Sequence, residues 1–180
     1  MNFWIERAKT EDVNALAEVM DRVADNMNNP AWFIRDDAAF IGARIGSVPL
    51  SKEDRGFVLK AMADTDKGPV LAGFFMVDFP GTGERNLGHH LNWDEEKLKQ
   101  VAHMDSVVIL PEFRGNGLQY RLMEQAEALI LAETDFTKLL ATVHPDNAFS
   151  LHNILKQGYE IAGEVMKYGT YRRYVVKKEF

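Results

Sequence analysis

Apolar positions along this chain follow two different spacings, and these spacings predict its strands and helices. Short apolar runs rich in β-branched and aromatic residues favour strands, whereas apolar residues three or four positions apart favour helices. Strands are predicted over residues 3–7, 57–63, 70–79, 101–110, 138–143, 159–167 and 171–178. Helices are predicted over residues 10–27, 31–44, 117–132 and 147–157. Strands and helices are therefore interleaved along the whole chain.

Turn-forming residues separate these elements. The segment 64–69 (DTDKGP) lies between two strands and predicts a hairpin. Thr10 is expected to cap the first helix, and Gly158 to end the last one from the C′ position. Residues 80–99 are polar and contain glycine, so we expect a long loop there, with a short helix near residues 95–99. Long loops in compact domains are often functional.

The order of elements, β-α-α-β-β-β-α-β-α-β-β, predicts the fold class. Strands joined by helices favour parallel pairing, and hairpins require antiparallel pairing. We therefore expect an α/β fold with a mixed, partly parallel central sheet flanked by helices. No linker divides the chain, and its length suits one domain, so residues 1–180 are predicted to form a single domain.

Charge and composition narrow the classes of function. The chain has 21 Lys and Arg residues against 27 Asp and Glu, a formal net charge of −6. This balance disfavours nucleic-acid binding, which needs cations to neutralise phosphates, and mildly favours a cationic substrate. No cysteine is present, so the sequence offers no disulfide, no thiolate nucleophile and no cysteine-based zinc site.

The sequence also bears on where the protein acts. The first residues, MNFWIERAKTEDV, carry acids early and lack a long apolar core, so no signal peptide is expected. No run reaches the roughly 20 apolar residues that a membrane-spanning helix requires. His89 and His90 are adjacent, which is not the spacing of metal ligands on one helix face. We therefore expect a cytoplasmic protein with no membrane partner and no metal site.

The most informative segment is VVILPEFRGNGLQ, residues 107–119, which runs from a strand through a glycine-bearing loop into a helix. A helix N-terminus presents unpaired N–H groups and a partial positive charge. Gly115 and Gly117 would let this backbone approach an anion, and Arg114 adds a cationic donor. The segment suits a phosphate or pyrophosphate group. It lacks the Gly-Lys-Ser/Thr of a Walker loop, and a tight turn without a ligand explains the loop alone equally well.

Two motifs give the chain a resemblance to the GNAT N-acetyltransferase superfamily. PEFRGNGL resembles the family's acetyl-CoA pyrophosphate loop, Arg/Gln-x-x-Gly-x-Gly/Ala. Arg114 and Gly117 match its first two fixed positions, and Gln119 replaces the usual Gly or Ala. Downstream, HPDNAFSLHNILKQGYE resembles a second family signature, which Asn147, Ser150, Gly158 and Tyr159 match.

The resemblance implies a cofactor, acetyl-CoA, and the residues that hold it. Backbone groups of Val107, Val108 and Ile109 would pair with the pantetheine arm, and Asn147 would hydrogen-bond to it. The pyrophosphate would be held by Arg114, Gly115, Asn116, Gly117, Leu118 and Gln119.

The implied function is direct transfer of an acetyl group from acetyl-CoA to a small-molecule or peptide amine. One alternative is a non-catalytic acyl-CoA-binding module of the same fold, and another is an unrelated phosphate-binding or interaction domain. The last two strands are candidates for a homodimer contact.

His103 and Asp105 are the candidate catalytic residues. They lie two positions apart on a predicted strand, so they face the same side of the sheet, and they interrupt an otherwise apolar run. A histidine side chain suits proton transfer near neutral pH. Alternatively, the pair hydrogen-bonds to neighbours on the sheet face. Many relatives have a tyrosine acid where this chain has Ile154. His144, Tyr159 or water could replace it, or the thiolate could leave without an acid.

Overall fold

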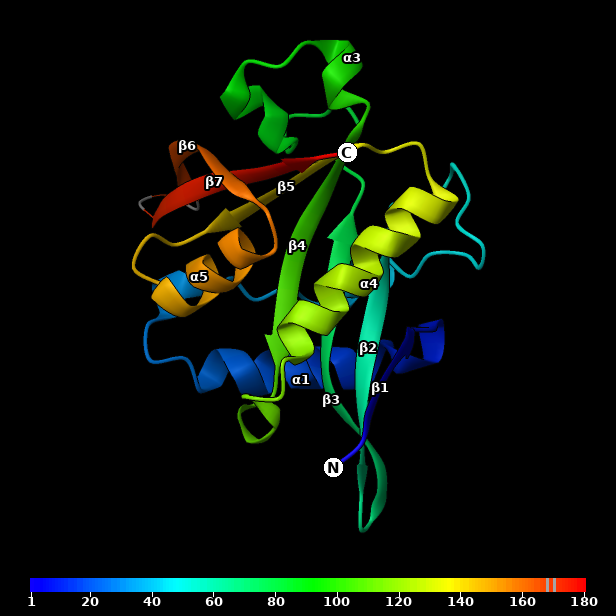
Figure 1. Ribbon diagram of the computed structural model, residues 1–180. Coiled ribbons are helices and arrows are strands. Elements are labelled where there is room, and N and C mark those ends of the chain that lie inside the picture. Colours follow the sequence, from blue (N-terminus) through cyan, green and yellow to red (C-terminus); the bar gives the residue numbers. More distant parts are fainter. Residues whose placement is uncertain (168, 170) are drawn as a thin grey trace. The chain divides into compact units, whose positions relative to one another are not determined.

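The computed structural model of the chain describes residues 1–167, 169 and 171–180 (Figure 1). These residues form two compact units, one built from residues 1–78 and 106–134 and the other from residues 79–105 and 135–180. Strand β4 (Val101–Ile109) contributes residues to both units. A single domain over the whole chain remains a prediction.

Among the described residues, seven strands form one sheet in the order β1-β2-β3-β4-β5-β7-β6. Besides β4, the strands are β1 (Phe3–Arg7), β2 (Gly56–Thr65), β3 (Gly68–Asp78), β5 (Lys138–Val143), β6 (Glu160–Lys167) and β7 (Tyr171–Glu179). β4 and β5 pair in parallel, whereas β1–β2, β2–β3, β5–β7 and β6–β7 pair antiparallel. The predicted mixed, partly parallel sheet is confirmed.

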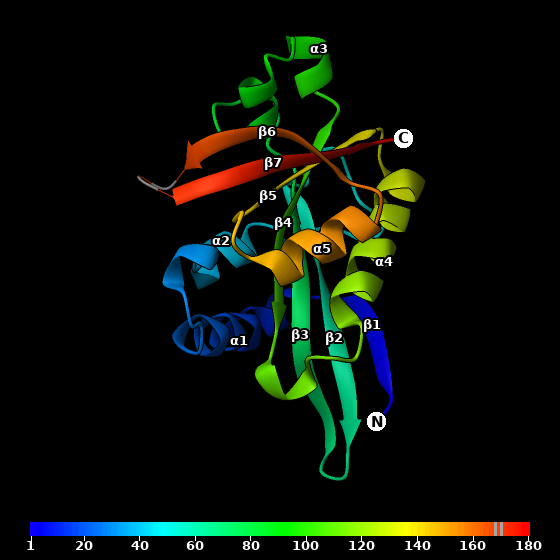
Figure 2. The same ribbon diagram turned by 60° about the vertical axis from the view of Figure 1, so that its left-hand side comes forward.

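In the first unit, helices cover both faces of the strands. Figures 1 and 2 show α1 (Val13–Asp25) on one face and α4 (Leu118–Glu133) on the other. Every residue of β3 from Ala72 to Asp78 is buried. A strand that is buried without alternation is typical of a sheet covered on both faces.

In the second unit, the predicted long loop is folded onto the sheet. Its 3₁₀ helix, Leu87–Leu91, contributes Leu87 to a core with Val101, Leu140 and Val175. The fully buried Asn86 donates from Nδ2 to the carbonyl oxygens of Gly81 (2.6 Å) and Leu98 (3.0 Å). The short helix predicted near residues 95–99 is present as α3 (Glu95–Leu98). α5 (Ala148–Lys156) is this unit's longest helix.

The predicted helix over residues 31–44 is wrong. Only a 3₁₀ turn, Pro30–Trp32, and the short α2, Ala38–Gly42, are helical there. Asp37 is extended and accepts a hydrogen bond from the Phe40 N–H, so it begins a new helix instead of continuing an earlier one. After α2, the buried Arg44 side chain pairs with Asp78 of β3, with Nε 2.8 Å from Oδ1.

The predicted cap at Thr10 is also wrong. The chain first forms a 3₁₀ turn, Thr10–Asp12, for which Lys9 is the N-cap residue. Asp12 accepts a hydrogen bond from the Lys9 N–H (2.7 Å) and pairs with Lys60 of β2 (2.8 Å). Asp12 therefore holds the start of this helical segment through its hydrogen bond with Lys9 and its ion pair with Lys60, and Thr10 is not the cap.

A glycine sets how closely β3 and β4 approach. A Cβ atom on Gly73 would lie 2.3 Å from the carbonyl oxygen of Val108 and 2.7 Å from Cδ1 of Ile109. Real Cβ atoms do not come so close to backbone, so a larger residue would push the end of β4 away. The Leu110 N–H also donates to the Ala72 carbonyl oxygen (3.0 Å). These contacts fix residues 107–110, which include three predicted cofactor-binding positions.

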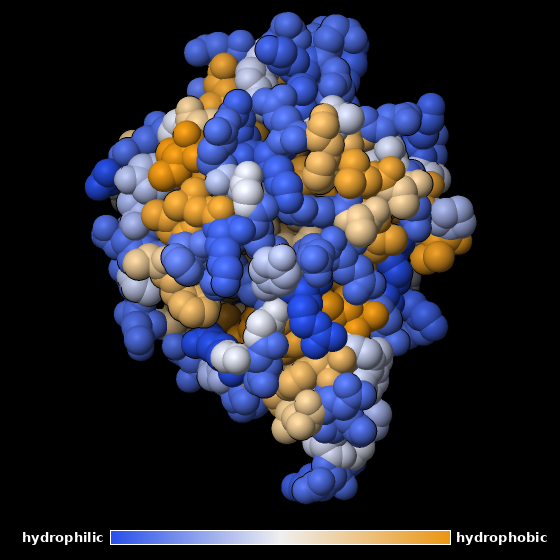
Figure 3. Space-filling model, in the orientation of Figure 1, coloured by the Kyte–Doolittle hydropathy of each residue, from blue (hydrophilic) through white to orange (hydrophobic). Residues whose placement is uncertain are grey.

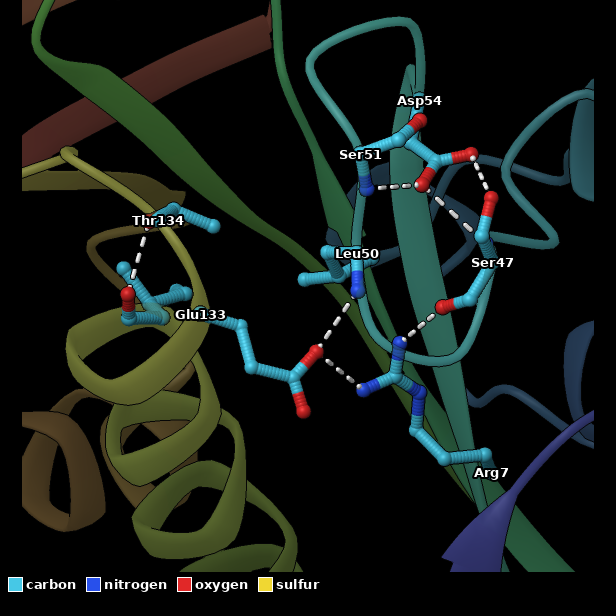
Figure 4. Close-up of polar contacts among 8 residues, drawn as sticks. Arg7, Ser47, Leu50, Ser51, Asp54, Glu133 and Thr134 are labelled. Atoms are coloured by element: carbon cyan, nitrogen blue, oxygen red, sulfur yellow. Dashed lines mark hydrogen bonds and ion pairs between the residues drawn. The ribbon is translucent and has the colours of Figure 1, made fainter.

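Glu133 anchors the C-terminal end of α4 (Figure 4). Its Oε2 accepts hydrogen bonds from the Leu50 N–H (2.8 Å) and from Nη1 of Arg7 (3.1 Å). In the same loop, Asp54 accepts from the N–H groups of Ser51 (2.7 Å) and Ser47 (3.1 Å). One carboxylate thus links α4, β1 and the loop before β2.

We expect Glu133→Gln to lower the free energy of unfolding at pH 7 by about 1–3 kcal/mol, because it weakens charge-assisted hydrogen bonds. The Leu50 N–H lowers the pKa of Glu133 below 4.5; partial burial opposes this, and Arg7 lowers it further. The folded pKa is depressed, so the stabilisation is present above the unfolded value and is lost as the pH falls through the folded one. Urea unfolding at pH 7 and at pH 3 measures this difference.

Glu124→Gln is the matched control, because Glu124 is an exposed glutamate on the same helix. It should change stability little at either pH. Equal effects of the two substitutions at pH 7 would contradict the role assigned to Glu133.

Candidate functional site

Strand β4 carries both candidate catalytic residues and three of the predicted cofactor-binding residues. His103 is only 4% exposed, whereas Asp105, two positions further, is exposed. Val108 is fully buried, and Val107 and Ile109 on either side of it are partly exposed. The buried side chain of Val108 therefore holds the backbone of residues 107–109 in place, and the side chains of Val107 and Ile109 remain partly accessible.

His103 has a backbone partner. Its Nε2 accepts a hydrogen bond from the Leu87 N–H at 3.0 Å, in a buried environment. The Nε2 lone pair of His103 is therefore engaged by the backbone of Leu87 and is not directed at open space. This is the contact to neighbours that the sequence left open as an alternative.

Between β4 and α4 the chain turns through a loop that depends on two glycines. After the 3₁₀ turn Pro111–Phe113, Gly115 has φ of +81° and Gly117 has φ of +69°. Residues with a Cβ adopt this left-handed conformation only at a cost of about 1–2 kcal/mol. At both positions a Cβ would meet nothing within 4 Å, so the space beside this backbone is open.

The loop leads directly into the N-terminus of α4. Gly117 is the N-cap residue and supplies no side-chain cap, and the first helical bond runs from the Arg121 N–H to the Gly117 carbonyl oxygen (3.1 Å). The first N–H groups of a helix lack partners inside the helix and carry a partial positive charge. An uncrowded glycine loop at such an end fits a phosphate or diphosphate group.

Arg114 adds a cation at the entrance of this loop. Its Nε donates to the Ile109 carbonyl oxygen (3.3 Å), which holds the exposed side chain beside the end of β4. Neither of its Nη groups has a hydrogen-bond partner among the described residues. Asn116 shapes the same turn by donating from Nδ2 to the Phe113 carbonyl oxygen (3.0 Å). The structure therefore places the Arg114 side chain beside Ile109, at the entrance of the glycine loop.

An acidic residue beside the loop was not singled out from the sequence. Nη2 of Arg22, on α1, pairs with Oε1 of Glu112 at 2.8 Å. The residue's own backbone N–H lowers the pKa of the Glu112 carboxyl; partial burial opposes this, and Arg22 and Arg114 lower it further. Arg22 offsets a negative charge that would otherwise repel an anion in the loop. Because 90 positions separate the pair, no local signal could have found it.

Asn147 belongs to the unit formed by residues 79–105 and 135–180. It is the N-cap residue of α5, and its Oδ1 accepts a hydrogen bond from the Ser150 N–H (3.2 Å). Its Nδ2 group has no hydrogen-bond partner among the described residues. The residue thus has a local structural role and keeps a donor for another group.

Comparison of the chain with models of protein families identifies its family. The model of the acetyltransferase (GNAT) family matches residues 4–159, which include the loop at 114–119 and Tyr159. The chain belongs to the GNAT acetyltransferase family. Among curated proteins, none matches the chain.

Solved GNAT structures have the same fold at low sequence identity. A GNAT-family acetyltransferase from Streptococcus pneumoniae is 19% identical, with a TM-score of 0.70, over 99% of this chain and 100% of that one. The ribosomal-protein-S18-alanine N-acetyltransferase from Escherichia coli is 13% identical, with a TM-score of 0.68, over 99% and 94% of the two chains. A phosphinothricin acetyltransferase from Sinorhizobium meliloti, in complex with acetyl-CoA, is 15% identical, with a TM-score of 0.68, over 100% and 89%.

GNAT enzymes use acetyl-CoA as acyl donor, and the loop at residues 114–117 fits that molecule. Its diphosphate carries negative charge, and the loop offers an open backbone, a helix N-terminus and the Arg114 guanidinium. Gln119 lies on the first turn of α4, so its departure from the family motif leaves the backbone of that turn intact.

The positions expected to supply a general acid are mostly engaged in structure. Ile154 is 6% exposed on α5 and Tyr159 is 3% exposed. Nδ1 of His144 accepts a hydrogen bond from the Asp146 N–H (3.1 Å), so this histidine stabilises the turn before α5. In the described part of the chain, no group of three or more His, Cys, Asp or Glu residues could hold a metal ion.

We expect Arg114→Ala to weaken acetyl-CoA binding about tenfold or more, because a hydrogen bond to a charged group contributes about 1.5–3 kcal/mol. Isothermal titration calorimetry of both proteins measures the two dissociation constants. Arg55→Ala is the control, because Arg55 is an exposed arginine of the same unit, far along the chain from the loop. Equal affinities of wild type and Arg114→Ala would show that the guanidinium does not contact the ligand.

Proposed function

We propose that this protein is an acetyl-CoA-dependent N-acetyltransferase that passes the acetyl group directly to an amine. The observation that carries the proposal is the open, left-handed glycine loop at the N-terminus of α4, in a chain of the GNAT family. Acetyl-CoA supplies the acetyl group as a thioester, which a neutral amine can attack.

Three parts of the chain would hold the donor. The loop Arg114, Gly115, Asn116, Gly117, Leu118 and Gln119 would bind the diphosphate. The backbone of Val107–Ile109 would pair with the pantetheine arm, and Nδ2 of Asn147 would donate to it. A backbone N–H near Val107 would hydrogen-bond to the acyl carbonyl oxygen, a contact of about 3 kcal/mol. Holding amine and thioester in line would lower the barrier further.

For the proton that the amine loses, we assign Asp105 as acceptor. It is exposed on β4, whereas Nε2 of His103 already accepts from the Leu87 N–H. His103 would then act as a positioning residue that holds β4 and the segment at Leu87 together. Because Ile154 stands where relatives have a tyrosine, the departing thiolate would take its proton from water or from His144.

The acceptor is proposed to be a small-molecule or peptide amine. By their names, one similar structure acetylates an alanine of a ribosomal protein and another acetylates phosphinothricin, so one fold serves both classes. The net charge of −6 favours a cationic amine over nucleic acid as partner. In the described part of the chain, no helix has the length and apolar character to cross a bilayer. The cytoplasmic location remains a prediction.

A second candidate is a non-catalytic acyl-CoA-binding module. The buried Ile154 in place of a tyrosine favours it, because the usual acid is missing from α5. The two candidates differ in one measurable respect. Only the enzyme releases free CoA thiol when acetyl-CoA is mixed with amines.

We expect thiol release from acetyl-CoA with at least one member of a panel of primary amines, amino acids and N-terminal peptides.

Asp105→Asn should lower kcat by about 10²–10⁴-fold and leave the acetyl-CoA dissociation constant unchanged, because it removes a proton acceptor only. Asp66→Asn, at an exposed aspartate in the β2–β3 turn, is the control. Acetyl-CoA binding without thiol release from any amine would favour the binding module, and full activity of Asp105→Asn would refute its assigned role.

A further inference from the structure

β6 is the last strand of the sheet, and among the described residues it pairs only with β7. Its sequence, EIAGEVMK, carries two exposed large apolar residues, Ile161 (47%) and Met166 (58%). Figure 3 shows apolar side chains on the surface over the region that α5, β6 and β7 occupy in Figure 1. An exposed apolar edge strand is a template for pairing with another strand.

A bulge places these two residues on the same face. Ile161 lies opposite Val176 and Met166 opposite Arg172, an even spacing along β7. The register shifts between Ile161 and Gly163, so Ala162 is the extra residue of β6. Without this bulge, residues 161 and 166 would point to opposite faces, because side chains alternate along a strand.

We propose that a second copy of the chain adds to this edge, with the two β6 strands antiparallel about a two-fold axis through Glu164. If Ala162 is left unpaired as it is against β7, Ile161 lies opposite the partner's Met166, and Glu160 opposite the partner's Lys167. The two exposed apolar residues would then cover each other on one face. A two-fold interface requires such self-complementarity. Every contact between a residue of one copy and a different residue of the other occurs twice, once in each direction.

Charge supports this register over a shifted one. Glu160 and Lys167 stand at the two ends of β6, so antiparallel pairing places opposite charges together at both ends. At the axis the two Glu164 carboxylates would meet, but each already pairs with Arg172 of its own chain (Nε to Oε1, 2.7 Å). Opposite-charge and apolar cross-strand pairs each contribute to sheet stability, and like charges oppose it.

The first test is the oligomeric state of the full-length protein by sedimentation equilibrium. We expect a dimer, and Met166→Lys should raise the dimer dissociation constant at least tenfold by placing a cation against Ile161. Phe149→Lys is the control, because Phe149 is 73% exposed on α5 and outside the strand. Monomeric wild type, or a dimer that Met166→Lys leaves intact, would overturn the inference.

The second test probes the register. Glu160→Lys and Lys167→Glu should each weaken the dimer, because each places like charges opposite one another, and the double variant should restore it. Lys177→Gln controls for the ion pair that Glu160 makes within its own chain (3.2 Å). A double variant as weak as the single ones would exclude this pairing. Neither test depends on acetyl transfer, so the inference and the proposed enzyme activity can fail separately.

Discussion

The passage of the chain from β4 into α4 requires left-handed backbone at two positions, and the candidate site depends on this turn. Gly115 and Gly117 take φ values of +81° and +69°, where a Cβ would introduce strain. The same absence of side chains leaves the N-terminus of α4 uncovered. The glycines that the turn requires are therefore also the residues that we propose to receive the anion. Arg114 then adds charge without having to shape the loop.

Contacts on both sides hold this turn in place. Before it, Gly73 allows β3 to approach the backbone of Val108, so the end of β4 cannot shift without losing close packing. After it, Glu133 fastens the far end of α4 to Leu50 and Arg7. A binding loop between two fixed elements loses little conformational freedom when it takes a ligand. This preorganisation fits a family in which the donor must be held while acceptors differ.

The sequence predicted what local rules determine. All seven strands, the helix after the loop and the helix that begins after Asn147 followed from apolar spacing and turn residues. The helix over residues 31–44 was wrong because Asp37 caps a new helix, which apolar spacing does not reveal. The hydrogen-bond partners of His103 and Glu112 could not be predicted from the sequence, for a different reason. Leu87 begins a 3₁₀ helix within the predicted long loop, and Arg22 is 90 positions from Glu112, so only the folded chain brings each pair together.

In the proposed function, the backbone of the β4–α4 turn binds the diphosphate of acetyl-CoA. Titration of ¹⁵N-labelled protein with acetyl-CoA, followed by amide chemical shifts, tests it most directly. We expect the largest shifts at the N–H groups of Gly115, Gly117, Leu118 and Gln119, with smaller ones along Val107–Ile109. Binding that leaves these amides unmoved, with its largest shifts elsewhere in the chain, would contradict the account.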